Sequence, residues 1–314
     1  MSAAHSRTIS GHPGAGAPCL AYHPVMGTPA ADLSDALEGI RGLLIDIDGV
    51  LVLRARPVPG AADALRAIEA RGLPFRLATN TSAISRATLA RHLAGIGLAV
   101  PAEAIITAAS AAAADVGRRH PGGRIFLIST ADARVEFAGL DLIGDARADG
   151  PDATAAAVVI GDAADELTFG QLDRAFGYLR TGADFVAMHK NRWWLTERGT
   201  TLDSGGLVVG LEYAAERRAR VVGKPAAAFF RAAIAAMAPA AGAPALRAPD
   251  VAMIGDDLWN DVLGAQRAGL RGIFVRSGKH GEAELARAAG QRRGGGRPDA
   301  VAADLAAVIA ALPS

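Results

Sequence analysis

Cysteine is almost absent from this chain of 314 residues, which contains Cys19 and no other. A single cysteine cannot form an internal disulfide, so we expect a protein of the reducing cytoplasm or one that is indifferent to redox conditions. An excess of charge of one sign is also missing, because 33 basic residues balance 32 acidic ones to a net charge of +1. This balance gives no basis for a nucleic-acid partner or a membrane partner.

Long hydrophobic runs and histidine pairs of metal-ligand spacing are missing as well. No apolar stretch reaches the roughly 18 residues that a membrane-spanning helix needs, and the N-terminus lacks the apolar block of a secretory signal. None of the seven histidines has ligand spacing to another histidine or to the cysteine, which disfavours zinc. Residues 1–35 are expected to form a flexible tail, with Met26 as an alternative start.

What the sequence does contain is a regular alternation of strand-like and helix-like segments from about residue 42 onward. The predicted strands are 42–47, 74–80, 219–224, 250–257 and 272–278, and the predicted helices are 60–72, 85–97, 226–237 and 259–269. Such alternation predicts an α/β fold in which helices cover both faces of a parallel sheet, a Rossmann-like doubly wound arrangement. Because parallel strands are buried on both faces, their near-continuous apolar character is expected.

The middle of the chain has strand and helix patterns of its own. Predicted strands at 124–130, 155–161 and 184–190 are joined by predicted helices at 168–182 and 207–218. This part is long enough to form a separate small α/β domain between two halves of the first. We therefore predict a tail at 1–35, a core formed by 36–111 and 220–314, and an inserted cap domain at 112–219.

Polar side chains stand at four predicted strand ends. In open parallel sheets, ligands bind beyond the carboxyl ends of the strands, so these side chains should share one crevice. They are Asp46 and Asp48, Thr79 and Asn80, Lys224, and Asp256 with Asp261 one helical turn further on. Clustered ionised carboxylates need a cation, and an all-oxygen ligand set suits Mg²⁺. A lysine in the same crevice supplies a point charge for a phosphate.

Each of these groups has a plainer interpretation when taken alone. Lys224 could be an ordinary surface lysine, and the polar run after Thr79 could serve only as a helix cap, a role that Ser82 or Ser85 fills better. Asp257 is interpreted as part of an acidic helix start, which the helix dipole favours. The four groups together, in this order, favour a phosphate site.

The run "HKNRWW" at 189–194 is the most chemically varied part of the inserted segment. We expect Trp193 and Trp194 to pack in the core of the cap or in an interface, with Lys190 and Arg192 in solvent. Contact between this run and a substrate is the alternative.

Four motifs resemble those of the haloacid dehalogenase-like hydrolases. They are "DIDGVLV", "LATNTS", "VVGKPAAAFF" and "VAMIGDDLWNDVLGAQRAG". Their order, and the large insertion before the lysine, resemble the subfamily IIA phosphatases, which carry a C2-type cap. The segments "AFGYLRTGADFVAMHKNRWW" and "LEYAAERRARVVGKP" look similar to the branch that contains phospholysine phosphohistidine inorganic pyrophosphate phosphatase and haloacid dehalogenase-like hydrolase domain-containing protein 2. The resemblance covers residues 42 to 312.

This resemblance implies a Mg²⁺-dependent phosphatase that acts on a small phosphorylated molecule through an aspartyl phosphate. Asp46 would be the nucleophile and Asp48 the general acid and base, while Thr79, Asn80 and Lys224 would bind the phosphoryl oxygens. Asp46, the backbone carbonyl of Asp48, and Asp256 would hold Mg²⁺, with Asp261 acting through a bound water. Related caps often dimerise, which implies a homodimer through the cap.

Other functions stay open on the sequence alone. A phosphomutase or other phosphotransferase of the same superfamily would use the same four motifs, although the large cap argues against it. A non-catalytic interaction protein could keep the fold. A response-regulator receiver also combines aspartates, Mg²⁺, threonine and lysine, but it has no insertion of about a hundred residues before the lysine. The leaving group is not specified, so phosphoric monoesters, P–N compounds and pyrophosphate all remain.

Overall fold

The computed structural model describes residues 32–144, 154–196, 199–237, 242, 244–291 and 295–313. Most of the predicted tail, together with Cys19 and Met26, lies outside these residues. The last part of that predicted tail instead belongs to helix α1 (Leu33–Leu37), whose Leu37 is fully buried. Among the described residues, no helix has the length and apolar character needed to cross a membrane.

A six-stranded parallel sheet forms the larger part of the molecule. Its strands are β1 (Gly42–Ile45), β4 (Phe75–Thr79), β5 (Ile105–Thr107), β12 (Val251–Gly255), β13 (Arg271–Val275) and β14 (Ala300–Ala302). Their order across the sheet is β14-β13-β12-β1-β4-β5, and each neighbouring pair is parallel. The central pair, β1 and β12, joins two parts of the chain about 200 residues apart, with Ile45 opposite Ile254. The predicted doubly wound parallel sheet is confirmed.

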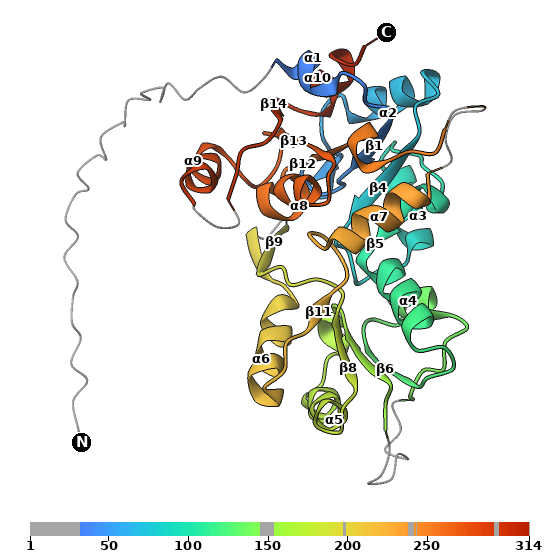
Figure 1. Ribbon diagram of the computed structural model, residues 1–314. Coiled ribbons are helices and arrows are strands. Elements are labelled where there is room, and N and C mark those ends of the chain that lie inside the picture. The colour runs from blue at the N-terminus through green and yellow to red at the C-terminus, as the bar shows by residue number, and fades with distance from the viewer. Residues whose placement is uncertain are drawn as a thin grey trace, which may run out of the picture.

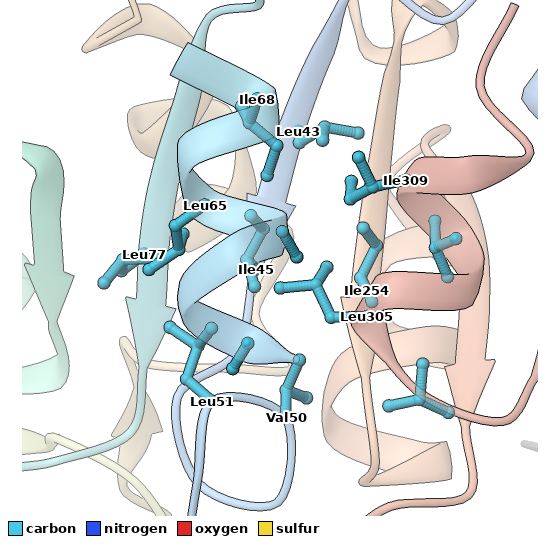
Figure 2. Close-up of a cluster of buried hydrophobic side chains, with 14 of the residues drawn as sticks. Leu43, Ile45, Val50, Leu51, Leu65, Ile68, Leu77, Ile254, Leu305 and Ile309 are labelled. Carbon is cyan, nitrogen blue, oxygen red and sulfur yellow. The ribbon is translucent and has the colours of Figure 1, made fainter. Parts of the chain in front are cut away.

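Helices cover both faces of this sheet (Figure 1). One face packs against α1, α2 (Ala61–Ala70), α3 (Arg86–Gly95) and α10 (Leu305–Ala310); the other packs against α7 (Ala227–Ala235) and α8 (Leu263–Arg267). Within β1, Leu43 and Ile45 point into the first layer and Leu44 into the second, as the period of two in a strand requires. Figure 2 shows the first layer, in which Ile45 lies between helices α2 and α10. Helix α9 (Glu282–Gly290) packs its Ala288 beside the outer strands.

A second, four-stranded parallel sheet lies below the first in Figure 1. Its order is β11 (Arg220–Val221), β8 (Asp184–Ala187), β7 (Ala157–Ile160) and β6 (Ile125–Ile128). Helix α4 (Ala108–Arg119) covers one face, and α5 (Phe169–Arg180) and α6 (Gly205–Ala215) cover the other. Two short antiparallel hairpins complete the described strands: β2 (Val52–Leu53) with β3 (Arg56–Pro57), and β9 (Trp193–Thr196) with β10 (Gly199–Leu202).

The predicted strand at 219–224 is present, but it pairs with β8 of the small sheet and not with the large one. The valine pair Val221 and Val222 indicates a strand without indicating its sheet, which explains the misplacement. Helix α4 likewise shares its buried cluster with the small sheet. The small α/β layer therefore reaches beyond 112–219 at both ends, while the division into a core and a cap domain stays a prediction.

Candidate active site

Three buried carboxylates meet where β1 and β12 end. Asp46 follows β1 directly, Asp256 follows β12, and Asp261 lies in the π-helical turn Leu258–Val262 that precedes α8. Oxygens of the three lie within 4.8 Å of one another, and all three side chains are buried. The parallel register of β1 and β12 brings Asp46 to the other two acids, although more than 200 residues separate it from them in the chain.

Lys224 lies in the middle of this cluster. Its ammonium Nζ is 2.7 Å from Asp46 Oδ1 and 2.6 Å from Asp261 Oδ1, and it donates a hydrogen bond of 2.8 Å to the carbonyl of Ala78. Burial by itself would lower the pKa of Lys224, but the carboxylates of Asp261 and Asp46 raise it above its ordinary value. The lysine is therefore charged, and it holds two acids from different elements in place.

The carboxylates carry more negative charge than Lys224 balances. Burial raises the pKa of Asp46, against the opposing effect of Lys224. Burial and then the charge of Asp46 raise the pKa of Asp256 well above its ordinary value, and they raise that of Asp261 to about 7. A bound divalent cation would remove this repulsion, and an all-oxygen donor set suits Mg²⁺. The residues present thus fit the predicted metal.

Asp48 differs from these three acids because its side chain is exposed to the cavity. It lines the same cavity, yet no hydrogen bond or ion pair joins its carboxylate to any residue that the structure describes. Although the side chain keeps exposed surface, the surrounding protein removes part of its water and so raises the pKa of Asp48, partly offset by the charge of Lys224. The next residue, Gly49, has a φ of +85°, and a Cβ added there would lie 2.2 Å from Asp256 Oδ2. A glycine at this position therefore lets the turn pass beside Asp256.

Thr79 and Asn80 end β4 next to the cluster. Thr79 is buried, and its hydroxyl oxygen accepts a hydrogen bond of 3.0 Å from the backbone N–H of Thr81. The Asn80 side chain makes two hydrogen bonds with the backbone of Lys224: Oδ1 accepts from its N–H at 2.8 Å and Nδ2 donates to its carbonyl at 3.0 Å. The Asn80 side chain thus positions Lys224, and its predicted contact with phosphate stays a prediction.

All seven predicted site residues line one cavity of about 740 Å³. This volume is far larger than a phosphoryl group, so room remains for a leaving group. The outer wall is largely apolar and includes Val52 and Leu53 of the β2–β3 hairpin and Trp194 and Leu195 of β9. Trp194 is 46% exposed.

Lys279 is a cavity residue that the sequence reasoning missed. Its Nζ lies 2.8 Å from Asp257 Oδ2, and its backbone N–H donates to Asp256 Oδ2 at 2.7 Å. Asp257 itself caps the following helical turn by accepting from the N–H groups of Trp259 and Asn260, as predicted. Although burial opposes it, the charge of Lys279 lowers the pKa of Asp257 to about 2. Because Lys279 follows the end of β13, the strand-end argument could have found it.

The run 189–194 packs only in part as expected: Arg192 is exposed to solvent, whereas other members contact the large-sheet side or line the cavity. His189 is buried and its Nε2 lies 2.9 Å from Ser82 Oγ on the large-sheet side. Lys190 forms an ion pair of 2.8 Å with the buried Glu212 and so is not simply solvated. Asn191 and Trp194 both line the cavity. The physical reason is that this run follows β8 and enters β9, which lies beside α8 of the large-sheet layer (Figure 1).

Of the two serines considered as a cap for the helix at 85–97, Ser85 fills that role. Its side chain accepts from the N–H of Thr88 at the start of α3. Ser82 instead bonds to His189 and accepts from the N–H of Asp162 at 3.0 Å. Ser82 therefore joins the loop after β4 to the small sheet.

The fold and the site together define a class of α/β enzymes with an aspartate-rich centre at the carboxyl edge of a parallel sheet, beneath an inserted cap. The family profile described as haloacid dehalogenase-like hydrolase matches residues 43–143, and the one described as HAD-hydrolase-like matches residues 221–308. The chain is 33% identical over 249 residues to mouse (Mus musculus) haloacid dehalogenase-like hydrolase domain-containing protein 2, covering 79% of this chain and 89% of the relative.

Two further similarities point the same way. The chain is 32% identical over 252 residues to the phospholysine phosphohistidine inorganic pyrophosphate phosphatase of Rattus norvegicus, with coverage of 78% and 86%. The solved structure of a glycerol phosphate phosphatase from Mycobacterium tuberculosis in complex with magnesium superimposes with a TM-score of 0.73 at 28% identity, covering 87% of this chain and 77% of that one. The chain belongs to the haloacid dehalogenase-like hydrolases, in subfamily IIA, and is an enzyme of the phosphatase type.

Proposed function

We propose that this protein is a Mg²⁺-dependent phosphatase that hydrolyses a small phosphorylated molecule through an aspartyl phosphate on Asp46. The observation that carries the proposal is the contrast between two aspartates two residues apart. Asp46 is buried and held by Lys224, whereas the Asp48 carboxylate faces the cavity without a bonding partner among the described residues. One is fixed as a nucleophile must be, and the other is free to exchange a proton.

The reaction would proceed in two steps. A carboxylate oxygen of Asp46 attacks phosphorus, the bond to the leaving oxygen breaks, and that oxygen takes a proton from Asp48. Asp48 then removes a proton from water, which attacks the phosphorus of the acyl phosphate, releasing inorganic phosphate and restoring Asp46. Lys224 and Thr79 would stabilise charge on the phosphoryl oxygens, and the cap would exclude water during the first step.

Asp46, the carbonyl of Asp48, and Asp256 would hold Mg²⁺, with Asp261 acting through a water. Both Asp261 oxygens have partners, since Oδ1 faces Lys224 Nζ and Oδ2 accepts from the N–H of Asp257 at 3.1 Å. This supports an indirect role for Asp261. The cation supplies charge neutralisation for the phosphoryl group when bound.

The outer cavity indicates a leaving group with apolar or aromatic surface. Trp194, Leu53 and Leu195 present partly exposed apolar side chains to a space well beyond what phosphate fills. Covering these side chains with apolar surface would contribute to binding. The relatives named above as phosphatases of phospholysine, pyrophosphate and glycerol phosphate support hydrolysis, not this preference.

The decisive experiment measures free phosphate released from a panel of phosphorylated metabolites and aryl phosphates with Mg²⁺. Asp46→Asn should lose essentially all turnover while staying folded. Asp63→Asn, which changes an exposed aspartate on α2, is the matched control and should keep full activity. Turnover by Asp46→Asn would refute the nucleophile, and transfer to an organic acceptor without free phosphate would establish a phosphotransferase.

A further inference from the structure

Asn191 lies where the small sheet meets the acid cluster. It lines the cavity from the cap side. Its side-chain oxygen Oδ1 accepts two hydrogen bonds from the large-sheet side, at 3.3 Å from Asn80 Nδ2 and at 3.1 Å from Asn260 Nδ2. One cap residue is thus bonded to two loops of the catalytic edge.

Both of those asparagines hold charged groups of the site. Asn80 bonds the backbone of Lys224 on both sides. Asn260 Nδ2 donates at 2.7 Å to Asp257 Oδ2, the oxygen that also pairs with Lys279. The oxygen of Asn191 therefore bridges the supports of the two lysines that line the cavity.

The cap side holds Asn191 equally firmly. Its backbone carbonyl accepts from the N–H of Gly205 at 3.1 Å, and a Cβ added to Gly205 would lie 2.2 Å from that same oxygen. Its backbone N–H donates at 3.4 Å to His189 Nδ1, and His189 Nε2 is bonded to Ser82. Only a glycine lets the start of α6 approach so closely, so the position of Asn191 is fixed from behind.

These contacts determine the orientation of the amide. Two NH₂ donors can be satisfied only by an oxygen, so the oxygen of Asn191 faces Asn80 and Asn260. Its own NH₂ group then points away from these two asparagines, and nothing among the residues that the structure describes accepts a hydrogen bond from it. Two fixed donors on a cavity wall suit an anionic or oxygen-rich ligand.

We propose that Asn191 is the cap's contribution to the reacting centre, with its NH₂ group donating a hydrogen bond to an oxygen of the bound phosphorylated substrate. This inference rests on the proposed function. It makes the site complete only when the cap is docked, because the donor comes from the small sheet and its orientation from Asn80 and Asn260. A phosphoryl oxygen and the leaving oxygen are the two acceptors of suitable chemistry.

Two substitutions separate this role from a purely structural one. Asn191→Ala removes both the acceptor and the donors, and we expect kcat/KM to fall about tenfold or more, as for a lost hydrogen bond to a charged group. Asn191→Asp keeps an oxygen for Asn80 and Asn260 but replaces the donors by an anion. If the NH₂ group binds substrate, Asn191→Asp should be at least as impaired as Asn191→Ala.

Lys190→Ala, which alters the neighbouring residue, is the matched control. It should stay within about twofold of wild type, because Glu212 keeps Arg218 at 3.2 Å as a second partner. Wild-type kinetics in Asn191→Asp, with an impaired Asn191→Ala, would show that Asn191 acts only as an acceptor and would overturn the proposal. Wild-type kinetics in both would overturn it as well.

Binding of inorganic phosphate in the presence of Mg²⁺ gives a readout independent of turnover. Calorimetry should show weaker phosphate binding by Asn191→Asp than by wild type. If wild type hydrolyses nothing in the panel, the proposed phosphatase function fails, while this binding difference still decides the role of Asn191. Equal phosphate affinity in wild type and both variants, together with equal kcat/KM wherever turnover exists, would refute it.

Discussion

The replacement of Lys224 by methionine tests the charge balance of the site. Lys224 is 3% exposed, and its ammonium Nζ lies 2.7 Å from Asp46 Oδ1 and 2.6 Å from Asp261 Oδ1. It therefore offsets part of the negative charge of these two carboxylates. Methionine keeps much of the length and apolar stem but removes the charge. Breaking a buried ion pair on one side costs about 3–5 kcal/mol, because the remaining charge stays buried and unpaired. A cost of that size corresponds to a fall in melting temperature of about 6–20 °C.

The assay is thermal or urea unfolding of metal-free protein, with Lys190→Met as the matched control. Lys190 also pairs with a buried acid, but its side chain is 28% exposed and Glu212 keeps Arg218 at 3.2 Å as a second partner. We therefore expect Lys190→Met to lose only about 0–1 kcal/mol. Equal stability losses in the two variants would refute the reasoning.

The stability of Lys224→Met relative to wild type should depend on pH in a defined direction. Burial and the charge of Asp46 raise the pKa of Asp261 to about 7 in the metal-free wild type, against the opposing effect of Lys224. Without the lysine this pKa can only rise further. A carboxyl whose folded pKa is raised binds a proton more readily when folded, so it destabilises the fold above that pKa and does so less as pH falls. The stability gap between Lys224→Met and wild type should therefore narrow from pH 8 to pH 6, and a widening gap would contradict this account.

Three further outcomes are expected. Saturating Mg²⁺ should stabilise the wild-type protein, by about 2.7 kcal/mol at a hundredfold excess over Kd, and Asp256→Asn should abolish that shift in a thermal unfolding scan. Gly49→Ala should displace Asp256, because the new Cβ would lie 2.2 Å from Asp256 Oδ2. Mg²⁺ binding should then weaken about tenfold or more, as it does when residues that orient a metal ligand are changed. Unchanged affinity by titration would count against Asp256 as a ligand. Trp194→Ala should raise KM for an aryl phosphate about fivefold while leaving small polar phosphates unaffected, whereas Tyr213→Ala, an aromatic 88% exposed on α6, should change neither.

The parallel sheet was predictable because its longer strands are apolar runs flanked by helical patterns. Strands β5 and β14 were missed, since three residues each are too few to show a pattern. The placement of β11 was wrong for a different reason: sheet membership depends on which edge is free, and here the edge of β8 was available. Local sequence contains no information about that edge.

The strand-end argument brought together all seven predicted site residues, and the structure places them around one cavity. Their chemical roles stay predictions, as do the cytoplasmic location and a homodimer through the cap. Lys279 was within reach of the same argument. Asn191 was not, because it follows a strand of the small sheet, and its place beside Asn80 and Asn260 depends on how the layers of the two sheets dock. Such long-range docking leaves no periodic signal in a single sequence.

The short distance in sequence between the end of β11 and Lys224 has a consequence for exchanging the cap domain. The last strand of the small sheet ends at Val221, three residues before the lysine that holds Asp46 and Asp261. Replacing this cap with another to change the substrate would also replace β11, the strand that fixes the position of Lys224 relative to Asp46 and Asp261. A productive chimera must therefore preserve the spacing from the final cap strand to Lys224, and a library that varies this spacing by single residues should show activity at one length alone.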